Sequence, residues 1–365
     1  MNKAPHLVHV FPAFGMGGMQ LRMASIINAL GSEFRHTIVS LNGDSEAADA
    51  VSPGTAAFVL MRKLAPRGPL VLRKTIRDLG PNLLLTYNWG AFDALMGSAI
   101  FSFCPVVHNE CGFGVDESVR LKWRRAFLRR VFLPRIHRTI VVSNRLVRIL
   151  QDQVRLPPRQ VRFIRTGVDT KRFRVERRWD WRRAAGVSDR DLLFGFVGRL
   201  GPEKNLAFLL QAFAEANIPD AKLALIGDGP LRDQLAQAGR DRGIADRLIF
   251  TGFVKDTAPY FMGLDVFLMS SITEQTPNAL LQATATGLPC ICTDAGDTAC
   301  VLGPSPYVCG SGNLSAYIEA LRGLASSQQL RESVGTANRQ RCESEYSFSR
   351  MVAEYADEYR SAHSY

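Results

Sequence analysis

Two basic residues stand just after an apolar run in the second half of the chain. Arg199 follows the segment Phe-Gly-Phe-Val-Gly, and Lys204 stands where a helical pattern begins. Cations beside a helix N-terminus suit a diphosphate, because each charge-assisted hydrogen bond contributes roughly 1.5–3 kcal/mol. Two solvated surface cations are an equally good interpretation of the same pattern.

An acidic residue and a second helix start follow another apolar run, at 265–269. The carboxylate of Glu274 can accept hydrogen bonds from sugar hydroxyls, and Gln282, about two helical turns further along, can reach a ribose. The helix that carries Gln282 is expected to begin near Pro277 or Asn278, and unpaired backbone N–H groups there, with Ala279, can hold a phosphate. Taken one at a time, these residues are also explained as ordinary polar positions.

The elements that must position these residues alternate along the chain. Strand-like apolar runs are separated by helical patterns, and the first run leads into a glycine-rich segment at 15–20. Such alternation predicts parallel sheets with helices on both faces. Because the series starts again near Asp191, we predict two doubly wound, Rossmann-like α/β domains at residues 1–172 and 173–342. An amphipathic helix within 343–365 is expected to pack back toward the N-terminal domain.

Bulk composition limits the class of protein. The 365 residues carry a net charge of +11, which requires an anionic partner: nucleic acid, an acidic lipid surface or a phosphorylated small molecule. The seven cysteines lack the paired spacing of zinc or redox sites, so we expect reduced, mostly buried thiols. The N-terminal segment lacks the features of a secretory signal, and no apolar run reaches the ~18 residues of a spanning helix.

A basic, aromatic segment at 119–138 is the densest source of positive charge. We predict a helix that lies on an anionic bilayer, each cation adding about 1 kcal/mol near the surface. An ordinary helix with arginines facing water is the alternative, and nucleic-acid binding is disfavoured because no recognised nucleic-acid motif accompanies the charge. The residues assigned to the membrane are Arg120, Lys122, Trp123, Arg124, Arg125, Phe127, Arg129 and Arg130.

The order of these motifs resembles the retaining family-4 glycosyltransferases of the GT-B fold, especially the group that builds bacterial exopolysaccharide and envelope glycans. The resemblance covers essentially the whole chain. Its motifs are VGRLGPEKN at 197–205, LALIGDGPLRDQL at 223–235, IFTGFV at 249–254, EQTPNALLQATATGLP at 274–289, HVFPAFGMGGMQ at 9–20, VVHNECGFG at 106–114, IVVSN at 140–144 and TGVDTKRF at 166–173. It implies an N-terminal acceptor domain and a C-terminal nucleotide-sugar domain that face each other across a cleft.

The resemblance also assigns roles in the C-terminal domain. It gives Arg199 and Lys204 to the donor diphosphate, Glu274 to the transferred sugar and position 282 to the ribose. The turn at Gly227 and the segment Phe253 and Val254 are assigned to the donor, the latter beside the base. Two residues depart from the family pattern. Position 282 is Gln instead of Glu, and Cys300 replaces a common glutamate.

In the N-terminal domain the resemblance places Gly17 and Gly18 where a loop approaches the donor phosphate and the acceptor, since glycine lets the backbone come close. The family histidine that abuts the sugar falls on His108 or on Cys111, depending on alignment, and we favour His108. A buried structural histidine is the alternative. A dinucleotide-binding oxidoreductase is disfavoured, because Gln20 occupies the last glycine position of that fingerprint.

We therefore predict a glycosyltransferase that moves a sugar from a nucleotide-sugar to a glycan or polyprenyl-diphosphate-linked acceptor, with retention. No aspartate pair is arranged for a metal-bound diphosphate, so cations and helix dipoles are expected to neutralise the leaving group without metal or cofactor. The predicted location is cytoplasmic, peripheral on the inner face of the plasma membrane. A non-catalytic descendant that binds a nucleotide or glycan and assists another transferase is the alternative.

Overall fold

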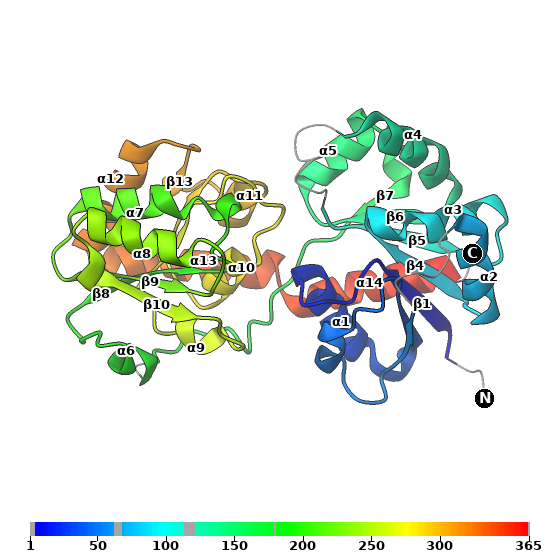
Figure 1. Cartoon of the computed structure of the whole chain (residues 1–365), viewed down its shortest axis with the longest axis horizontal. Helices are drawn as coiled ribbons and strands as arrows, with labels where there is room; N and C mark the ends of the chain where they lie inside the picture. The colour runs from blue at the N-terminus through cyan, green and yellow to red at the C-terminus, as the bar shows by residue number, and fades with distance from the viewer. Residues whose placement is uncertain (1–3, 62–67, 113–120, 179, 364–365) are drawn as a thin grey trace. The chain divides into compact units, whose positions relative to one another are not determined.

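The chain forms two compact units, which are described separately. The computed structural model describes residues 4–61, 68–112, 121–178 and 180–363. Unit 1 comprises Met1–Arg165 and Arg350–Tyr365, and unit 2 comprises Thr166–Ser349 (Figure 1). Within the described ranges, no helix is both long enough and apolar enough to cross a bilayer.

Unit 1 is built on a seven-stranded parallel sheet with the strand order β3-β2-β1-β4-β5-β6-β7. Strands β1, β4 and β5 are buried along their whole length, as expected for a parallel sheet with helices on both faces. The strand order reverses between β1 and β4, which is where ligands bind in such sheets. The strands are β1 (His6–Phe11), β2 (Arg35–Ser40), β3 (Ala56–Leu60), β4 (Leu83–Tyr87), β5 (Val106–Glu110), β6 (Arg138–Val141) and β7 (Val161–Phe163).

Six α-helices accompany this sheet in the described part of unit 1. They are α1 (Gly18–Leu30), α2 (Pro69–Asp78), α3 (Phe92–Ile100), α4 (Trp123–Phe132), α5 (Asn144–Asp152) and α14 (Phe348–His363). The C-terminal helix α14 returns to unit 1, as the amphipathic pattern predicts (Figure 1). Its Tyr359 ring meets Phe34 edge-on at 6.2 Å, and Arg360 Nε donates to Glu33 Oε1 at 2.6 Å.

Unit 2 repeats the arrangement with a six-stranded parallel sheet in the order β10-β9-β8-β11-β12-β13. Its order reverses between β8 and β11. The strands are β8 (Leu192–Val197), β9 (Ala221–Ile226), β10 (Leu248–Gly252), β11 (Val266–Met269), β12 (Cys290–Thr293) and β13 (Val308–Cys309). The helices are α6 (Asp180–Ala184), α7 (Leu206–Ala216), α8 (Arg232–Asp241), α9 (Ala258–Phe261), α10 (Asn278–Ala285), α11 (Thr298–Leu302), α12 (Leu314–Ser326) and α13 (Gln328–Glu345).

The junction between the units falls at Arg165 and Thr166, seven residues before the predicted boundary. The reason is local: Val168 N–H donates to the carbonyl of Tyr346 at 2.8 Å, and Phe348 N–H donates to that of Val168 at 3.1 Å. This bridge ties residues 166–173 to unit 2. It also uses backbone groups that a continuous helix would need, so α13 ends at Glu345 and α14, which lies within the predicted range 343–365, begins at Phe348.

Three buried histidines lie near one another in unit 1, and two of them, His9 and His36, are hydrogen-bonded to each other. His9 Nδ1 lies 2.8 Å from Tyr87 Oη, His9 Nε2 lies 3.0 Å from His36 Nδ1, and His6 Nε2 lies 2.7 Å from Thr37 Oγ1. Burial, and then the neighbouring His6, lower the pKa of His36 to about 4. Burial likewise lowers the pKa of His6, and lowers that of His9 well below its ordinary value. These imidazoles are therefore neutral at pH 7.

Acidification is expected to destabilise unit 1 through these histidines. Because the folded pKa of His36 lies below the unfolded value of about 6.5, its contribution is complete above pH 6.5 and is lost as pH falls toward 4. The loss is on the order of 3 kcal/mol for His36 alone. Thermal unfolding measured from pH 7.5 to 4.5 should show it. His36→Asn should flatten that dependence, and an unchanged slope in the variant would contradict the assignment.

Candidate functional site

The loops at the carboxyl edge of the second sheet pack backbone against backbone. Gly198 N–H donates to the carbonyl of Ile226 at 2.9 Å, and Leu200 N–H to that of Asp228 at 2.9 Å. Gly227 has φ +135°, and a Cβ there would lie 2.1 Å from the carbonyl oxygen of Gly198. The loops after β8 and β9 therefore approach each other at a distance that requires glycine at 227.

An ion pair joins two of the predicted donor residues across this edge. Lys204 Nζ donates to Glu274 Oε1 at 2.5 Å, and Ser271 Oγ donates to the same oxygen at 2.8 Å. The Lys204 side chain is 21% exposed and that of Glu274 is 15% exposed, so water still reaches both. The ammonium and the carboxylate are thus both partly buried and both still accessible to a ligand from solvent.

Backbone contacts hold the two partners in register. Ser270 Oγ donates to the carbonyl of Lys204 at 2.8 Å, and Ile272 N–H donates to the carbonyl of Glu203 at 2.9 Å. Asn205 adopts the left-handed conformation (φ 50°, ψ 45°) that turns the chain from the Lys204 segment into α7. The loop after β11 and the segment before α7 therefore form one hydrogen-bonded unit.

Gly296 packs against the backbone of the Glu274 loop, and the sequence analysis did not predict this role. Its φ is +63°, and a Cβ would lie 2.4 Å from the carbonyl oxygens of Glu274 and Gln275. Asp297 N–H also donates to the Gln275 carbonyl at 2.8 Å. The available signal was a glycine in the loop directly after the apolar run that forms β12.

Replacing Gly296 with alanine is expected to displace the Glu274 loop and weaken binding of a nucleoside diphosphate by at least tenfold. Gly312→Ala is the matched control, because Gly312 also has a left-handed φ, +76°, but open space where the Cβ would lie. Both variants carry similar backbone strain, roughly 1 kcal/mol. Isothermal titration with nucleoside diphosphates separates the two effects, and equal affinities in both variants would contradict the supporting role of Gly296.

The remaining donor residues line the same edge of unit 2. Helix α10 begins at Asn278 after Pro277, as predicted, and no side chain caps its N-terminus. Arg199 is exposed, Gln282 is half-buried on α10, and Phe253 is 75% exposed. Val254 instead packs against the core beneath. The exposed Cys300 lies on α11, and its carbonyl accepts from Tyr346 Oη at 3.0 Å.

In unit 1 the glycine-rich loop after β1 leads into α1. Gly17 is the N-cap, Gly18 is the first helical residue, and no side chain caps this end. Gln20 Nε2 donates to the carbonyl of Ala13 at 3.0 Å, and a Cβ at Gly17 would lie 2.5 Å from Gln20 Oε1. Gln20 therefore braces the loop from inside, in the space that Gly17 leaves open.

The structure does not support direct sugar contact by His108. This side chain is fully buried on β5, its Nδ1 lies 2.8 Å from Thr86 Oγ1, and the Phe92 ring meets it edge-on at 5.8 Å. Cys111, the alternative position, lies just beyond the strand end and is partly exposed. Arg22 Nη2 donates to its sulfur at 3.1 Å and favours the thiolate. Burial outweighs this effect, so the pKa of the Cys111 thiol is raised. Of these two residues, Cys111 is therefore the better candidate for contact with the sugar.

Helix α4 corrects one part of the membrane assignment. Arg129 is fully buried, with its Nε 3.0 Å from Glu110 Oε2 and its guanidinium 5.0 Å from the Trp89 ring centroid. Arg125 is half-buried and lies over the same ring at 5.1 Å. These two arginines face the interior because a buried carboxylate and an indole ring attract them.

The opposite face of α4 is exposed and combines aromatic with basic side chains. Trp123 is 73% exposed and Phe127 is 60% exposed. Lys122, Arg124 and Arg130 are exposed as well, whereas Arg120 lies outside the described residues. This narrower set keeps the composition of an interfacial helix, with rings and cations on one side.

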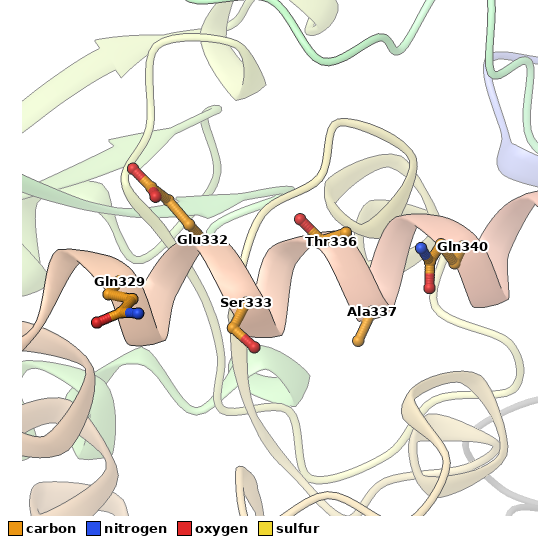
Figure 2. Close-up of a pocket in the computed structure, with 6 residues that line it drawn as sticks. All are labelled: Gln329, Glu332, Ser333, Thr336, Ala337 and Gln340. Atoms are coloured by element: carbon orange, nitrogen blue, oxygen red, sulfur yellow. The ribbon is translucent and has the colours of Figure 1, made fainter.

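Two further observations concern possible ligand sites. A shallow hollow over α13 is lined by Gln329, Glu332, Ser333, Thr336, Ala337 and Gln340, whose side chains spread along the helix without converging (Figure 2). It contains none of the predicted site residues.

In the part of the chain that the structure describes, no three His, Cys, Asp or Glu side chains are grouped to hold a metal ion.

Comparison with known proteins gives the family of both units. The family model for Glycosyltransferase Family 4 matches residues 16–172, and the model for Glycosyl transferases group 1 matches residues 191–327. A UDP-Gal:alpha-D-GlcNAc-diphosphoundecaprenol alpha-1,3-galactosyltransferase of Escherichia coli is 30% identical over 210 residues, which are 54% of this chain and 53% of that protein. An N-acetyl-alpha-D-glucosaminyl L-malate synthase of Bacillus anthracis is 25% identical over 59% of this chain and 57% of its own. The chain thus spans about half the length of the curated relatives it matches.

Solved structures agree on the fold. A glycosyltransferase from Rickettsia africae superposes with a TM-score of 0.83 at 13% identity, covering 99% of each chain. Anabaena Alr3699/HepE, solved in complex with UDP and glucose, gives 0.80 at 16% identity over 98% of this chain and all of its own. With both units matched and the fold shared, this chain belongs to glycosyltransferase family 4 and has the GT-B fold of two Rossmann-like domains.

Proposed function

We propose that the protein transfers a sugar from a nucleotide-sugar to a glycan or lipid-linked acceptor in envelope glycan synthesis. The observation that carries this proposal is the Lys204–Glu274 pair, held at 2.5 Å beside the start of α10. It offers a cation and helix amides to a diphosphate and a carboxylate to sugar hydroxyls. Relatives named for transfer to a diphosphoundecaprenol-linked sugar and for glycolipid synthesis support this substrate class.

In the proposed mechanism, Arg199, Lys204 and the N-terminus of α10 bind the donor diphosphate. As the bond from the anomeric carbon to the diphosphate breaks, the acceptor hydroxyl oxygen bonds to that carbon from the same face. The hydroxyl proton passes to the departing phosphate oxygen. Lys204 and the helix amides stabilise the negative charge that develops on the leaving group, without a metal ion. Retention at the anomeric carbon follows from the front-face geometry.

Transfer of labelled sugar tests this proposal. Wild type and Glu274→Ala are incubated with labelled UDP-glucose, UDP-galactose or UDP-N-acetylglucosamine and with polyprenyl-diphosphate-linked N-acetylglucosamine or a glycan acceptor. Wild type should label an acceptor, and Glu274→Ala should lose at least 99% of that activity. A wild-type protein that is as silent as the variant with every donor and acceptor would overturn catalysis.

A non-catalytic descendant is the second candidate function. It is favoured by three departures from the family pattern: Gln282 and Cys300, each where glutamate is common, and the family histidine position, which falls on His108 or on Cys111. Such a protein would bind UDP without transferring sugar. Titration with UDP beside the transfer assay therefore separates the two functions.

We also propose that the exposed face of α4 binds an anionic membrane. Replacing both Trp123 and Phe127 with alanine is expected to reduce flotation with phosphatidylglycerol vesicles at least fivefold, because these rings supply the buried apolar area. Val175→Ala is the matched control, since Val175 is 70% exposed in unit 2. Equal flotation with neutral and anionic vesicles would count against this surface.

A further inference from the structure

Asn88 has an unusual backbone conformation at the end of β4. Its φ of 53° and ψ of −178° fall in a region that glycine adopts and that other residues rarely do. Asn205 and Asn217 also have positive φ, but their ψ values of 45° and 52° place them in the left-handed helical region that asparagine tolerates. The conformation of Asn88 is therefore strained, and surrounding contacts must maintain it.

Three hydrogen bonds of Asn88 join three segments of unit 1. Its Oδ1 accepts from Cys111 N–H at 2.7 Å, and its own N–H donates to the carbonyl of Asn109 at 2.9 Å. Its Nδ2 donates to Met19 Sδ at 3.4 Å. One side chain thus links the ends of β4 and β5 to the first turn of α1.

These segments meet where the strand order of the first sheet reverses. Met19 directly follows Gly17 and Gly18, and Arg22, one turn later, donates to Cys111 Sγ at 3.1 Å. Cys111 is therefore held by its backbone through Asn88 and by its side chain through Arg22. Asn88 is only half-buried, so core packing does not account for its strained conformation.

We infer that Asn88 is a positioning residue of the acceptor site. It fixes the main chain of Cys111 relative to the glycine-rich loop, and the backbone strain is retained because this link orders the acceptor-binding edge. The inference rests on the proposed function and on the prediction from the sequence that the N-terminal domain binds the acceptor.

Asn88→Gly separates this role from a structural one. Glycine relieves the backbone strain but removes both side-chain hydrogen bonds, so the unfolding temperature should equal or exceed that of wild type. The KM for the polyprenyl-diphosphate-linked acceptor should rise at least tenfold. The KM for the UDP-sugar, measured by its slow hydrolysis without acceptor, should stay within twofold, because Arg22 still holds the Cys111 side chain. Asn88→Asp keeps an oxygen for Cys111 N–H and should restore the acceptor KM to within threefold.

Asn217→Gly is the matched control. Asn217 caps the C-terminal end of α7 in unit 2, so glycine relieves positive φ there and should leave both KM values unchanged. An active wild type with an unaltered acceptor KM in Asn88→Gly overturns the inference alone, as does a lowered unfolding temperature with both KM values raised together. A wild type that transfers no sugar overturns the proposed function, and this inference with it.

Discussion

Glu274→Gln is expected to reduce sugar transfer by 100- to 1,000-fold while strengthening UDP binding about tenfold. Glutamine keeps the size of the side chain but not its charge, so interactions with the reacting sugar are lost. The same change releases Lys204 from the carboxylate that now lies 2.5 Å away and makes its full charge available to the diphosphate. Activity and nucleotide affinity should therefore change in opposite directions.

Labelled-sugar transfer and isothermal titration with UDP measure the two effects. Lys204→Ala is the complementary variant and should weaken UDP binding by tenfold or more, since the diphosphate loses a charged hydrogen bond. Glu332→Gln is the matched control, because it removes one exposed carboxylate on α13, remote in sequence from the site. If Glu274→Gln binds UDP more weakly than wild type, the carboxylate does not compete with the diphosphate for Lys204.

The architecture was predictable because continuous apolar runs ended in glycine or polar residues. That pattern predicts parallel strands with helices between them. The structure confirms both sheets and the start of α10 at Asn278, directly after Pro277. The pairing of Lys204 with Glu274 was not predictable. Seventy residues separate them, and only the hydrogen bonds between their two loops bring the charges together.

Helix α4 shows why residue type alone did not predict which face of the helix packs against unit 1. Helical spacing correctly groups Arg125 with Arg129 and Trp123 with Phe127, but it does not say which group faces the sheet. The prediction assumed that every arginine faces solvent or lipid. Arg129 instead pairs with Glu110, a carboxylate at the end of a buried strand. The side chains of Trp123 and Phe127 are therefore on the exposed face of the helix. The assignment of His108 stays a prediction for a similar reason: residue type does not give the direction of a side chain on a strand, and this side chain is fully buried on β5.

The buried pair of Glu110 and Arg129 predicts the largest stability effect in unit 1. Both side chains are fully buried. Burial alone would raise the pKa of Glu110, but Arg129, with a contribution from His108, lowers it below its ordinary range. Arg129→Met should therefore destabilise unit 1 by about 3–5 kcal/mol, because it leaves a buried carboxylate without its cation. Thermal and urea unfolding of the full chain would measure the loss.

The double variant Glu110→Gln with Arg129→Met distinguishes the cost of an unpaired charge from a loss of packing. Removing both charges should recover more than half of the loss seen in Arg129→Met, since no ion then remains buried alone. Lowering the pH should partly rescue Arg129→Met as well, because protonation neutralises Glu110, and it should not rescue the double variant in the same way. Equal losses in the single and double variants would mean that Arg129 stabilises the unit through its stack on Trp89, not through its charge. Since α4 also carries the exposed Trp123 and Phe127, flotation of Arg129→Met with phosphatidylglycerol vesicles shows whether the proposed membrane face depends on this buried anchor.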